Sequence, residues 1–421
     1  MRGNRTKGKI MKVSEVNVKN FKRFTKLSIT GIPEEAKLII LVGPNGCGKS
    51  SLFDAFNSWY KTHTVSGHSN DQSYYMKEEV EGFNTKKNIN IAFHGLNKAP
   101  NKKEIMCFRT AYRNDPDFTI TNIIKPPQEL KIQRFIDNDK AVSENYQRLI
   151  LNTMMELYSE DNNEKTVKEL REELIGKIRK SMINVFDDLI LNNIGDPLEA
   201  GSFYFKKGTI ESYHYKNLSG GEKAAFDLLL DFIIKVETHK DSVFFIDEPE
   251  THMHTSLQGK LVKELYKIVS ENGQLWIATH SFGIMNMGRK LSQENPKSVV
   301  FLDFTGLDFD EDVNLSPSSI DSVLWEKLLS ITLDDFDGNH SKEFIVFCEG
   351  DVNGKKRRNF DARIYSKIFG HRYPQITFIS GGSCTDIEKD DHLGIALLKW
   401  RRAWKTGPRG ARKTRPPMPK E

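Results

Sequence analysis

Long uninterrupted apolar runs are missing from this chain of 421 residues. The longest apolar stretch, residues 226–236, is interrupted by Asp227 and Asp231 and is shorter than the ~20 apolar residues of a membrane-spanning helix. Residues 1–10 are basic and polar, without the apolar segment of a secretory signal peptide. We therefore expect no membrane association and a cytoplasmic location.

Cysteine is also scarce, with four residues in the whole chain. They are scattered, and they show neither the short spacings of a zinc site nor a disulfide framework. The four residues are Cys47, Cys107, Cys348 and Cys384. This usage is typical of a protein in a reducing compartment and argues against a small disulfide-stabilised secreted domain.

The main body of the chain has no large excess of positive or negative charge, although the formal net charge of the whole chain is +5. Residues 399–421 hold nine Lys or Arg and one Glu, a net +8 that leaves −3 for residues 1–398. The main body is therefore not an evident polyanion-binding surface, and the basic excess belongs to a tail that we expect to be disordered.

The sequence does contain a complete phosphate-binding pattern, Gly-Pro-Asn-Gly-Cys-Gly-Lys-Ser, at residues 43–50. It follows the apolar run 38–42, and a strand, a glycine turn and a helix start are the context that this loop requires. We expect its amides to point at phosphate oxygens, Lys49 to reach the β- and γ-phosphates, and Ser50 to ligate Mg²⁺. The predicted nucleotide-binding residues of this segment are Gly43, Asn45, Gly46, Gly48, Lys49, Ser50 and Ser51.

Two further motifs lie in the middle of the chain. Residues 218–223, Leu-Ser-Gly-Gly-Glu-Lys, open a predicted helix, and about twenty residues later an apolar strand ends in Asp247 and Glu248. Each pattern alone is common in turns and helix caps, but their order and spacing favour a functional pair. We expect Asp247 to hold Mg²⁺ through water and Glu248 to polarise the attacking water as general base. His280, at the end of the next predicted strand, is placed to contact the γ-phosphate.

These four motifs together resemble those of ABC-type ATPases. The counterparts of the Walker A, signature, Walker B and switch-histidine motifs are residues 43–50, 218–223, 244–249 and His280. The resemblance is to the soluble branch of the RecF and SMC proteins and the OLD family, in which Asn-Phe-Lys, here 20–22, and Glu-Pro-Glu-x-His-x-His, here 248–254, are usual. It covers residues 12–305 and implies ATP and Mg²⁺ as cofactors.

The resemblance also implies that two copies of the chain sandwich two ATP molecules. Ser219, Gly220, Gly221 and Glu222 of one copy would then complete the site that holds Lys49 of the other. One signature and one phosphate loop per chain imply a homodimer or a higher even oligomer. The glutamine that normally joins sheet and lobe is not obvious; Gln72 is a candidate, with a merely solvated loop glutamine as the alternative.

The hydrophobic pattern predicts an α/β fold that agrees with an ABC-type P-loop NTPase. Core strands are expected at 37–42, 242–246, 273–279 and 298–304, and core helices at 49–61, 221–237 and 255–271. An antiparallel β lobe is expected from residues 12–30, 88–95 and 104–113, with a surface loop at 62–87. The ATPase domain would span 1–305.

A helical insertion is predicted at 126–196, followed by a strand at 202–206. Apolar residues recur in it at spacings of three and four, which gives one stripe. The stripe consists of Val167, Leu170, Leu174, Ile178, Met182, Val185 and Leu189. It either packs on the domain or forms a coiled-coil arm. Such an arm would be far shorter than those of SMC proteins, which argues against a cohesin-like role.

After a linker at 306–341, residues 342–398 resemble the first half of a TOPRIM fold. The expected elements are a strand at 343–348, a helix at 361–369 and a strand at 375–380. In that fold the strand-end glutamate, here Glu349, binds the Mg²⁺ for phosphodiester cleavage. The Asp-x-Asp that completes such a site is missing from the later sequence, so we do not expect this chain to cut DNA by itself.

The basic segment 399–421 has two explanations. One is a cut or shifted reading frame near residue 399, and the other is a disordered tail that touches nucleic acid electrostatically. Our leading hypothesis is a dimeric ATPase that senses infection and regulates a nuclease or toxin effector, as in bacterial anti-phage ATPase–TOPRIM systems. The alternatives are a RecF-like DNA-repair ATPase and an ATP-bound scaffold that holds a partner toxin.

Overall fold

The computed structural model describes residues 12–64, 72–95, 106–110, 148–151, 164–195, 202–318, 344–348, 360–369 and 376–380. The chain divides into two compact units, Met1–Thr332 and Leu333–Glu421. Within the described ranges, no helix has both the length and the apolar character needed to cross a membrane.

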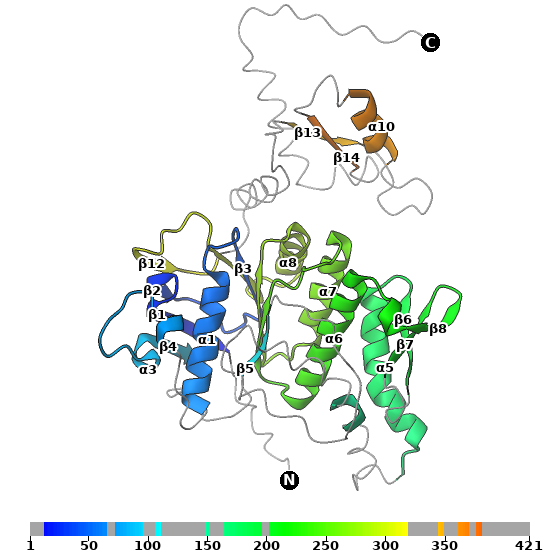
Figure 1. Cartoon of the computed structure of the whole chain (residues 1–421), viewed down its shortest axis with the longest axis horizontal. Helices are drawn as coiled ribbons and strands as arrows, with labels where there is room; N and C mark the ends of the chain where they lie inside the picture. The colour runs from blue at the N-terminus through cyan, green and yellow to red at the C-terminus, as the bar shows by residue number, and fades with distance from the viewer. Residues whose placement is uncertain are drawn as a thin grey trace, which may run out of the picture. The chain divides into compact units, whose positions relative to one another are not determined.

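A five-stranded parallel sheet forms the centre of the first unit (Figure 1). In spatial order its strands are β11 (Val299–Asp303), β3 (Leu38–Val42), β10 (Gln274–Thr279), β9 (Val243–Asp247) and β5 (Met106–Arg109). Their sequences are mostly apolar, because parallel strands are covered on both faces. Sequence reasoning placed 104–113 in the antiparallel lobe; this was wrong, because β5 pairs parallel with β9.

Helices cover both faces of this sheet (Figure 1). Side chains such as Ile39, Leu41 and Trp276 point to the face covered by α1 (Lys49–Thr64), while Ile40 and Ile246 point to the opposite face. Four helices cover that opposite face: α5 (Val167–Val185), α6 (Gly220–Thr238), α7 (Thr255–Ile268) and α8 (Phe282–Glu294).

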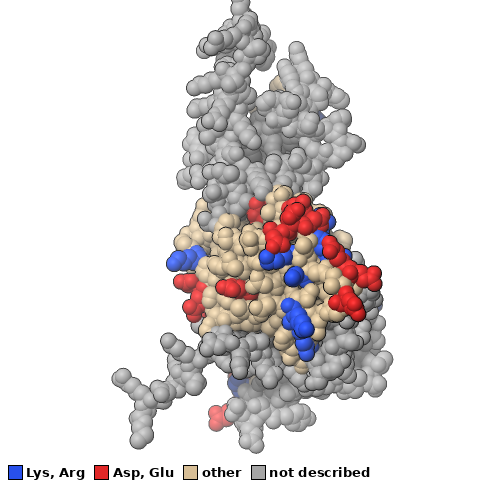
Figure 2. Space-filling model, turned by 90° about the vertical axis from the view of Figure 1, so that its left-hand side faces the viewer, with Lys and Arg blue, Asp and Glu red and all other residues tan. Residues whose placement is uncertain are grey.

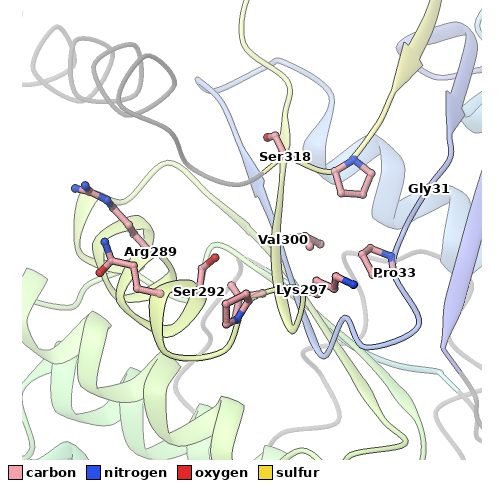
Figure 3. A pocket seen from close by; sticks show the side chains of 11 residues that line it. Gly31, Pro33, Arg289, Ser292, Lys297, Val300 and Ser318 are labelled. Carbon is pink, nitrogen blue, oxygen red and sulfur yellow. The ribbon is translucent and has the colours of Figure 1, made fainter.

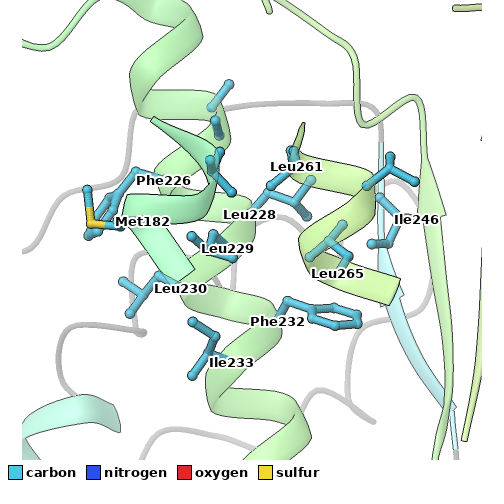
Figure 4. Close-up of a cluster of buried hydrophobic side chains, with 14 of the residues drawn as sticks. Met182, Phe226, Leu228, Leu229, Leu230, Phe232, Ile233, Ile246, Leu261 and Leu265 are labelled. Atoms are coloured by element: carbon cyan, nitrogen blue, oxygen red, sulfur yellow. The ribbon is translucent and has the colours of Figure 1, made fainter. Parts of the chain in front are cut away.

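Helix α6 lies inside this second layer and is apolar on nearly all sides. Figure 4 shows it between Met182 of α5 and Leu261 of α7. The two acids that interrupt its sequence are both buried and bonded. The Tyr215 hydroxyl donates to Asp227 at 2.7 Å, and Asp231 pairs with Lys235 at 3.0 Å. Their charge is therefore compatible with a core helix.

The lobe has the strand order β12 (Asp312–Leu315), β2 (Phe24–Ile29), β1 (Val13–Phe21), β4 (Ile89–Phe93). Strand β1 pairs antiparallel with β2 and β4 as predicted, but β12 pairs parallel with β2. The predicted surface loop 62–87 is wrong in part, because it contains the short helices α2 (Gln72–Tyr75) and α3 (Thr85–Asn88). The linker predicted at 306–341 is also wrong at its start. Val313 of β12 is buried, and β12 completes the lobe by pairing with β2.

Figure 2 views the molecule from the side on which the lobe lies in Figure 1, and acidic and basic side chains are interspersed there. Lys26 pairs with Asp312 at 2.5 Å, and Lys77 pairs with Asp310 at 2.6 Å. Pairs of this kind neutralise each other, so this face does not carry charge of one sign.

A third sheet follows α5, with the strands β6 (Leu189–Ile194), β7 (Phe203–Lys207) and β8 (Ile210–His214), all antiparallel. The helical prediction for 126–196 is therefore wrong at its end, where β6 begins. In the described part of the stripe, Ile178, Met182 and Val185 are buried against the domain. This favours packing over a free coiled-coil arm for α5.

The second unit contains a parallel β-α-β arrangement. Its elements are β13 (Phe344–Cys348), α10 (Phe360–Phe369) and β14 (Ile376–Ser380), close to the predicted positions. The two strands pair from Phe344 opposite Ile376 to Cys348 opposite Ser380. Glu349 and the tail 399–421 lie outside the described residues.

Two glycines allow the packing of the helices to be tested. A Cβ atom at Gly288 of α8 would lie 2.3 Å from Ile40 Cδ1 and 2.9 Å from Phe301 Cζ, whereas a Cβ atom at Gly176 of α5 meets nothing within 4 Å. We expect Gly288→Ala to lower the free energy of unfolding by about 1–3 kcal/mol through overpacking. Gly176→Ala should raise it by up to about 1 kcal/mol through helix propensity. Urea unfolding measures both, and shifts in the same direction would contradict the packing of α8.

Candidate nucleotide-binding site

Three adjacent strands end at the same edge of the central sheet. Val42 of β3 lies opposite Thr279 of β10, and Ala278 lies opposite Asp247 of β9. The segments that follow these strands are the phosphate loop, the turn beginning at Glu248, and His280. Because parallel strands share one carboxyl edge, motifs separated by more than 200 residues in sequence lie next to each other.

The glycines of the loop 43–50 are required by its shape. Gly46 has φ 78° and Gly48 has φ 98°, both in the left-handed region that favours glycine. A Cβ atom at Gly43 would lie 2.7 Å from Cys47 Sγ, and one at Gly48 would lie 3.1 Å from Phe24 Cε1. The loop is therefore a closely packed backbone turn, the form that lets amides approach a phosphate chain.

Lys49 is the buried cation of this loop. Its Nζ atom donates to the carbonyl oxygens of Gly43 and Pro44 at 2.8 and 2.9 Å, so the side chain folds back along the loop. Asn45, Gly46 and Ser50 are exposed around it. A nucleotide approaching these exposed backbone groups would meet the ammonium group at the base of the loop.

The lobe holds the loop from the other side. Lys22 pairs with Asp54 of α1, and its Nζ lies 3.8 Å from the centre of the Tyr74 ring. Asn20 exchanges two hydrogen bonds with the backbone of Glu78, at 2.9 and 3.0 Å. The Asn-Phe-Lys segment thus joins the β1–β2 hairpin to the helix that begins at Lys49.

Asp247 and Ser50 form the part of the site that suits a metal ion. Burial raises the pKa of Asp247 to about 7, with Glu248 and Glu250 adding to the rise and the Ser50 hydroxyl and Lys49 opposing it. A hydroxyl bonded to a carboxylate is the hard oxygen donor set that Mg²⁺ prefers, completed by substrate phosphates. The Ser50 hydroxyl and the Asp247 carboxylate therefore fit Mg²⁺ that arrives with a nucleotide. Among the described residues, no group of three or more His, Cys, Asp or Glu could hold a metal ion.

Glu248 stands at the end of β9 in a strained backbone conformation. Its φ is 43°, uncommon for a residue with a side chain, and its N–H donates to the Ala278 carbonyl at 2.9 Å. Its carboxylate is 28% exposed and lies 3.7 Å from Nδ1 of His280. The strain turns the side chain into a position where water can reach it, and such strain is concentrated at functional sites.

Sequence reasoning assigned no role to Glu250, although it lies in the Glu-Pro-Glu pattern. Its Oε1 atom accepts hydrogen bonds from the Thr279 hydroxyl at 2.7 Å and from the His280 N–H at 3.0 Å. Burial raises the pKa of this carboxyl, while its bonds to Thr279 and His280 oppose the rise. A second glutamate two residues after the predicted base was the only sequence signal for it.

The signature segment forms the N-terminus of α6. Ser219 caps the helix: its Oγ accepts from the Glu222 N–H at 3.3 Å, and the Glu222 carboxylate accepts from the Ser219 N–H at 2.9 Å, the two halves of a capping box. Burial would raise the pKa of Glu222, but the ion pair with Lys207 and the bonds from Ser219 outweigh it and lower the pKa. The Glu222 carboxylate thus stabilises the N-terminus of α6.

The helix start is open at Gly220 and closed at Gly221. Ser219 and Gly220 are exposed, and a Cβ atom at Gly220 meets nothing within 4 Å. A Cβ atom at Gly221 would lie 2.7 Å from the carbonyl oxygen of His252, in the turn after β9. One side of the signature is therefore available to an approaching molecule, and the other packs on the chain itself.

Two candidates from the sequence are not assembled at this site. Gln72 begins α2, but only its backbone is described, so its proposed contact stays a prediction. Glu349 lies outside the described residues.

A cavity of about 450 Å³, shown in Figure 3, is lined by residues including Arg289, Lys297 and Val300. It lies at the opposite, amino-terminal edge of β11 and is not part of the nucleotide site.

Comparison with known proteins gives one family match. The family model described as "RecF/RecN/SMC N terminal domain" matches residues 12–297, more than half of the chain. No curated protein sequence matches. The family assignment therefore depends on this one match.

Many solved structures are similar, and three of them, all at low identity, are SMC heads. The first is an SMC head bound to the C-winged helix domain of ScpA, 12% identical with a TM-score of 0.43, covering 75% of this chain and 99% of that one. The second is the SMC head domain from Thermotoga maritima, which is 15% identical with a TM-score of 0.37. That match covers 74% of this chain and 100% of the other. The third is an SMC head domain with an extended coiled coil bound to the C-terminal domain of ScpA derived from Pyrococcus furiosus. It is 15% identical with a TM-score of 0.37, and the match covers 77% of this chain and 99% of the other.

The buried carboxyl of Asp247 predicts a pH-dependent cost to stability. Its folded-state pKa is about 7, above the usual value, so the folded chain is destabilised as the pH rises from about 4 to 7, and fully so above 7. In the absence of nucleotide and Mg²⁺, we expect Asp247→Asn to raise the melting temperature, more at pH 8 than at pH 5. The control is Asp188→Asn at an exposed position, which should leave the melting temperature unchanged at both pH 5 and pH 8. An equal effect of Asp247→Asn at both pH values would contradict the assignment.

Proposed function

From the membership of this chain in the RecF/RecN/SMC N-terminal domain family, a group of ABC-type P-loop ATPases, we propose that it is an ATP-driven dimeric switch. In this proposal two copies close around ATP, and the closed dimer controls a nuclease or toxin effector. The observation that carries it is the open start of α6, where exposed Ser219 and Gly220 lie unobstructed at a helix N-terminus. A helix N-terminus of this kind favours an anion such as a phosphate.

Each step of ATP hydrolysis has a residue suited to it. The amides of Gly46 and Gly48 and the ammonium of Lys49 would hold the phosphates. Ser50 and Asp247 would hold Mg²⁺, which neutralises charge on the phosphate oxygens. Glu248 would take a proton from the attacking water. His280, whose Nδ1 lies 3.7 Å from Oε1 of Glu248, would contact the γ-phosphate.

The sandwich makes a specific prediction for mixed variants. Lys49→Ala removes the phosphate cation, and Gly220→Arg adds a bulky side chain at the open helix start, where a Cβ atom meets nothing within 4 Å. Each variant alone should lose ATPase activity, and Lys49→Ala should also lose ATP binding. A mixed dimer keeps one intact site, so an equal mixture should recover up to about a quarter of wild-type activity. The control is Lys49→Ala mixed with a chain carrying both changes, which should recover nothing. Absence of recovery in the first mixture would contradict the sandwich.

The effector part of the proposal is supported by the second unit. In the described part of this unit, one crossover helix joins two paired parallel strands. On α10, Tyr365, Ile368 and Phe369 are 42, 60 and 38% exposed, which suits a contact with another polypeptide. We propose that residues 342–398 are a partial TOPRIM-like region that binds the effector, and that residues 1–305 drive it. Glu349 would be its metal ligand if a partner supplied the rest of such a site.

The context that we propose is anti-phage defence, as in the OLD-type ATPase–TOPRIM systems. The alternative is a RecF-like DNA-repair ATPase, which the description of the matched family also favours. The two differ in what triggers the switch, phage infection in one case and damaged DNA in the other.

Cells that express this chain with its neighbouring genes can separate these roles. For defence, we expect phage to plate less efficiently and survival after ultraviolet irradiation to be unchanged. Glu248→Gln should remove the protection, because it slows hydrolysis by about 100-fold or more while ATP still binds. Protection that survives in Glu248→Gln would favour a scaffold, and an effect on ultraviolet survival alone would favour repair.

A further inference from the structure

Glu250 is a buried carboxylate that the mechanism above does not use. Its side chain is 6% exposed, and it lies two residues beyond the proposed base, in the turn that follows β9. Oε1 accepts two hydrogen bonds, from the Thr279 hydroxyl at 2.7 Å and the His280 N–H at 3.0 Å. Oε2 is buried and accepts no hydrogen bond from any residue that the structure describes. A charged group is costly to bury, so its presence needs a reason beyond packing.

Both donors belong to the segment that ends β10. Thr279 is the last residue of the strand, and His280 follows it directly. The Oε1 atom of Glu250 also lies 3.4 Å from Nδ1 of His280. One oxygen atom therefore contacts the backbone of His280 and faces one nitrogen of its ring.

The imidazole of His280 lies between two carboxylates. Glu248 Oε1 is 3.7 Å from Nδ1, and Glu250 Oε1 is 3.4 Å from the same atom. Glu248 is partly exposed and held by a strained backbone, whereas Glu250 is enclosed and hydrogen-bonded. Of these two carboxylates, Glu250 is therefore the one suited to fix the ring, because Glu248 is the one that water can reach.

We propose that Glu250 is the positioning residue of His280. It holds the backbone of His280 at the strand end and keeps Nδ1 facing inward, which leaves Nε2 as the nitrogen available to the substrate. This inference rests on the proposed role of His280 in hydrolysis at this site. The buried Nδ1 of His280 makes no hydrogen bond within the described residues, and Oε1 of Glu250, at 3.4 Å, is the nearer of the two carboxylate oxygens beside it. A carboxylate that faces one ring nitrogen is a general way of orienting a histidine.

A second set of bonds makes the frame around Glu250 stiff. The Gln258 side chain of α7 donates to the Met253 carbonyl at 2.8 Å, and the Met253 N–H donates to the Glu250 carbonyl at 2.9 Å. Gln258 Oε1 also accepts a bond from the Ser281 hydroxyl, which caps α8. The turn after β9 is thereby tied to the start of α8, with His280 between them.

A positioning role predicts an effect on turnover rather than on binding. Glu250→Ala removes the acceptor, so the purified full-length chain should lose about tenfold or more in kcat, while its Kd for ATP changes by less than about threefold. Glu250→Gln keeps an oxygen that can accept from both donors and should retain most of kcat. Hydrolysis and ATP binding are measured together with melting temperatures.

A matched control is available in Glu264, which is equally buried in the same domain and accepts a bond from Asn184 at 3.0 Å. Glu264→Ala should lower stability without a selective loss of kcat. The decisive measurement is a double-mutant cycle with His280→Ala. If Glu250 acts through His280, Glu250→Ala should cause no further loss of kcat in the His280→Ala background.

Three other outcomes would overturn the positioning role of Glu250. Losses that multiply in the double variant, an unaffected Glu250→Ala, or a Glu250→Gln as inactive as Glu250→Ala would overturn the inference. The Glu248→Gln variant separates this from failure of the proposed function. If Glu248→Gln stops hydrolysis while the Glu250 variants do not, only the positioning role is wrong. If the wild-type chain hydrolyses no ATP, the proposed function itself is wrong.

Discussion

The parallel register of β3, β10 and β9 is the constraint on which the site depends. It places Val42, Thr279 and Asp247 at one edge, so that each strand delivers its functional residues to the same place. A shift of one strand by a single residue would also exchange the two faces of the sheet, because Ile39 and Ile40 belong to different core clusters. The geometry of the site and the integrity of both cores are therefore fixed by the same pairing.

Close packing then holds the connecting segments at this edge. Phe24 of the lobe lies against Gly48 of the loop, and Lys22 pairs with Asp54 of α1, so the lobe is attached to the helix that carries Lys49. On the other side of the sheet, α8 packs closely against the side chains of Ile40 and Phe301 at the position of Gly288. Helix α8, which begins two residues after His280, therefore cannot shift independently of the sheet.

The sequence was sufficient for the motifs and for most of the parallel core, because loops and apolar strands leave strong local signals. It was insufficient where pairing is decided by distant residues. The short strand β12 follows a polar stretch and forms only because β2 offers an edge, and β5 joins β9 across more than 130 residues. At the site, the positions of Lys49 and Asp247 could be predicted from pattern alone. The role of Glu250 could not, because its partners Thr279 and His280 are some 30 residues away and only the fold brings them near.

The end of β9 has a consequence for how this protein changes over evolutionary time. Asp247 is buried at a cost, and Glu248 occupies a backbone conformation that suits glycine or asparagine better. Both residues make the folded chain less stable than ordinary replacements would, so the fold alone gives no reason to retain them. In a lineage that no longer needed ATP hydrolysis, these two positions would be among the first to drift. Their presence in this chain is therefore better explained by the chemistry proposed for the site than by folding.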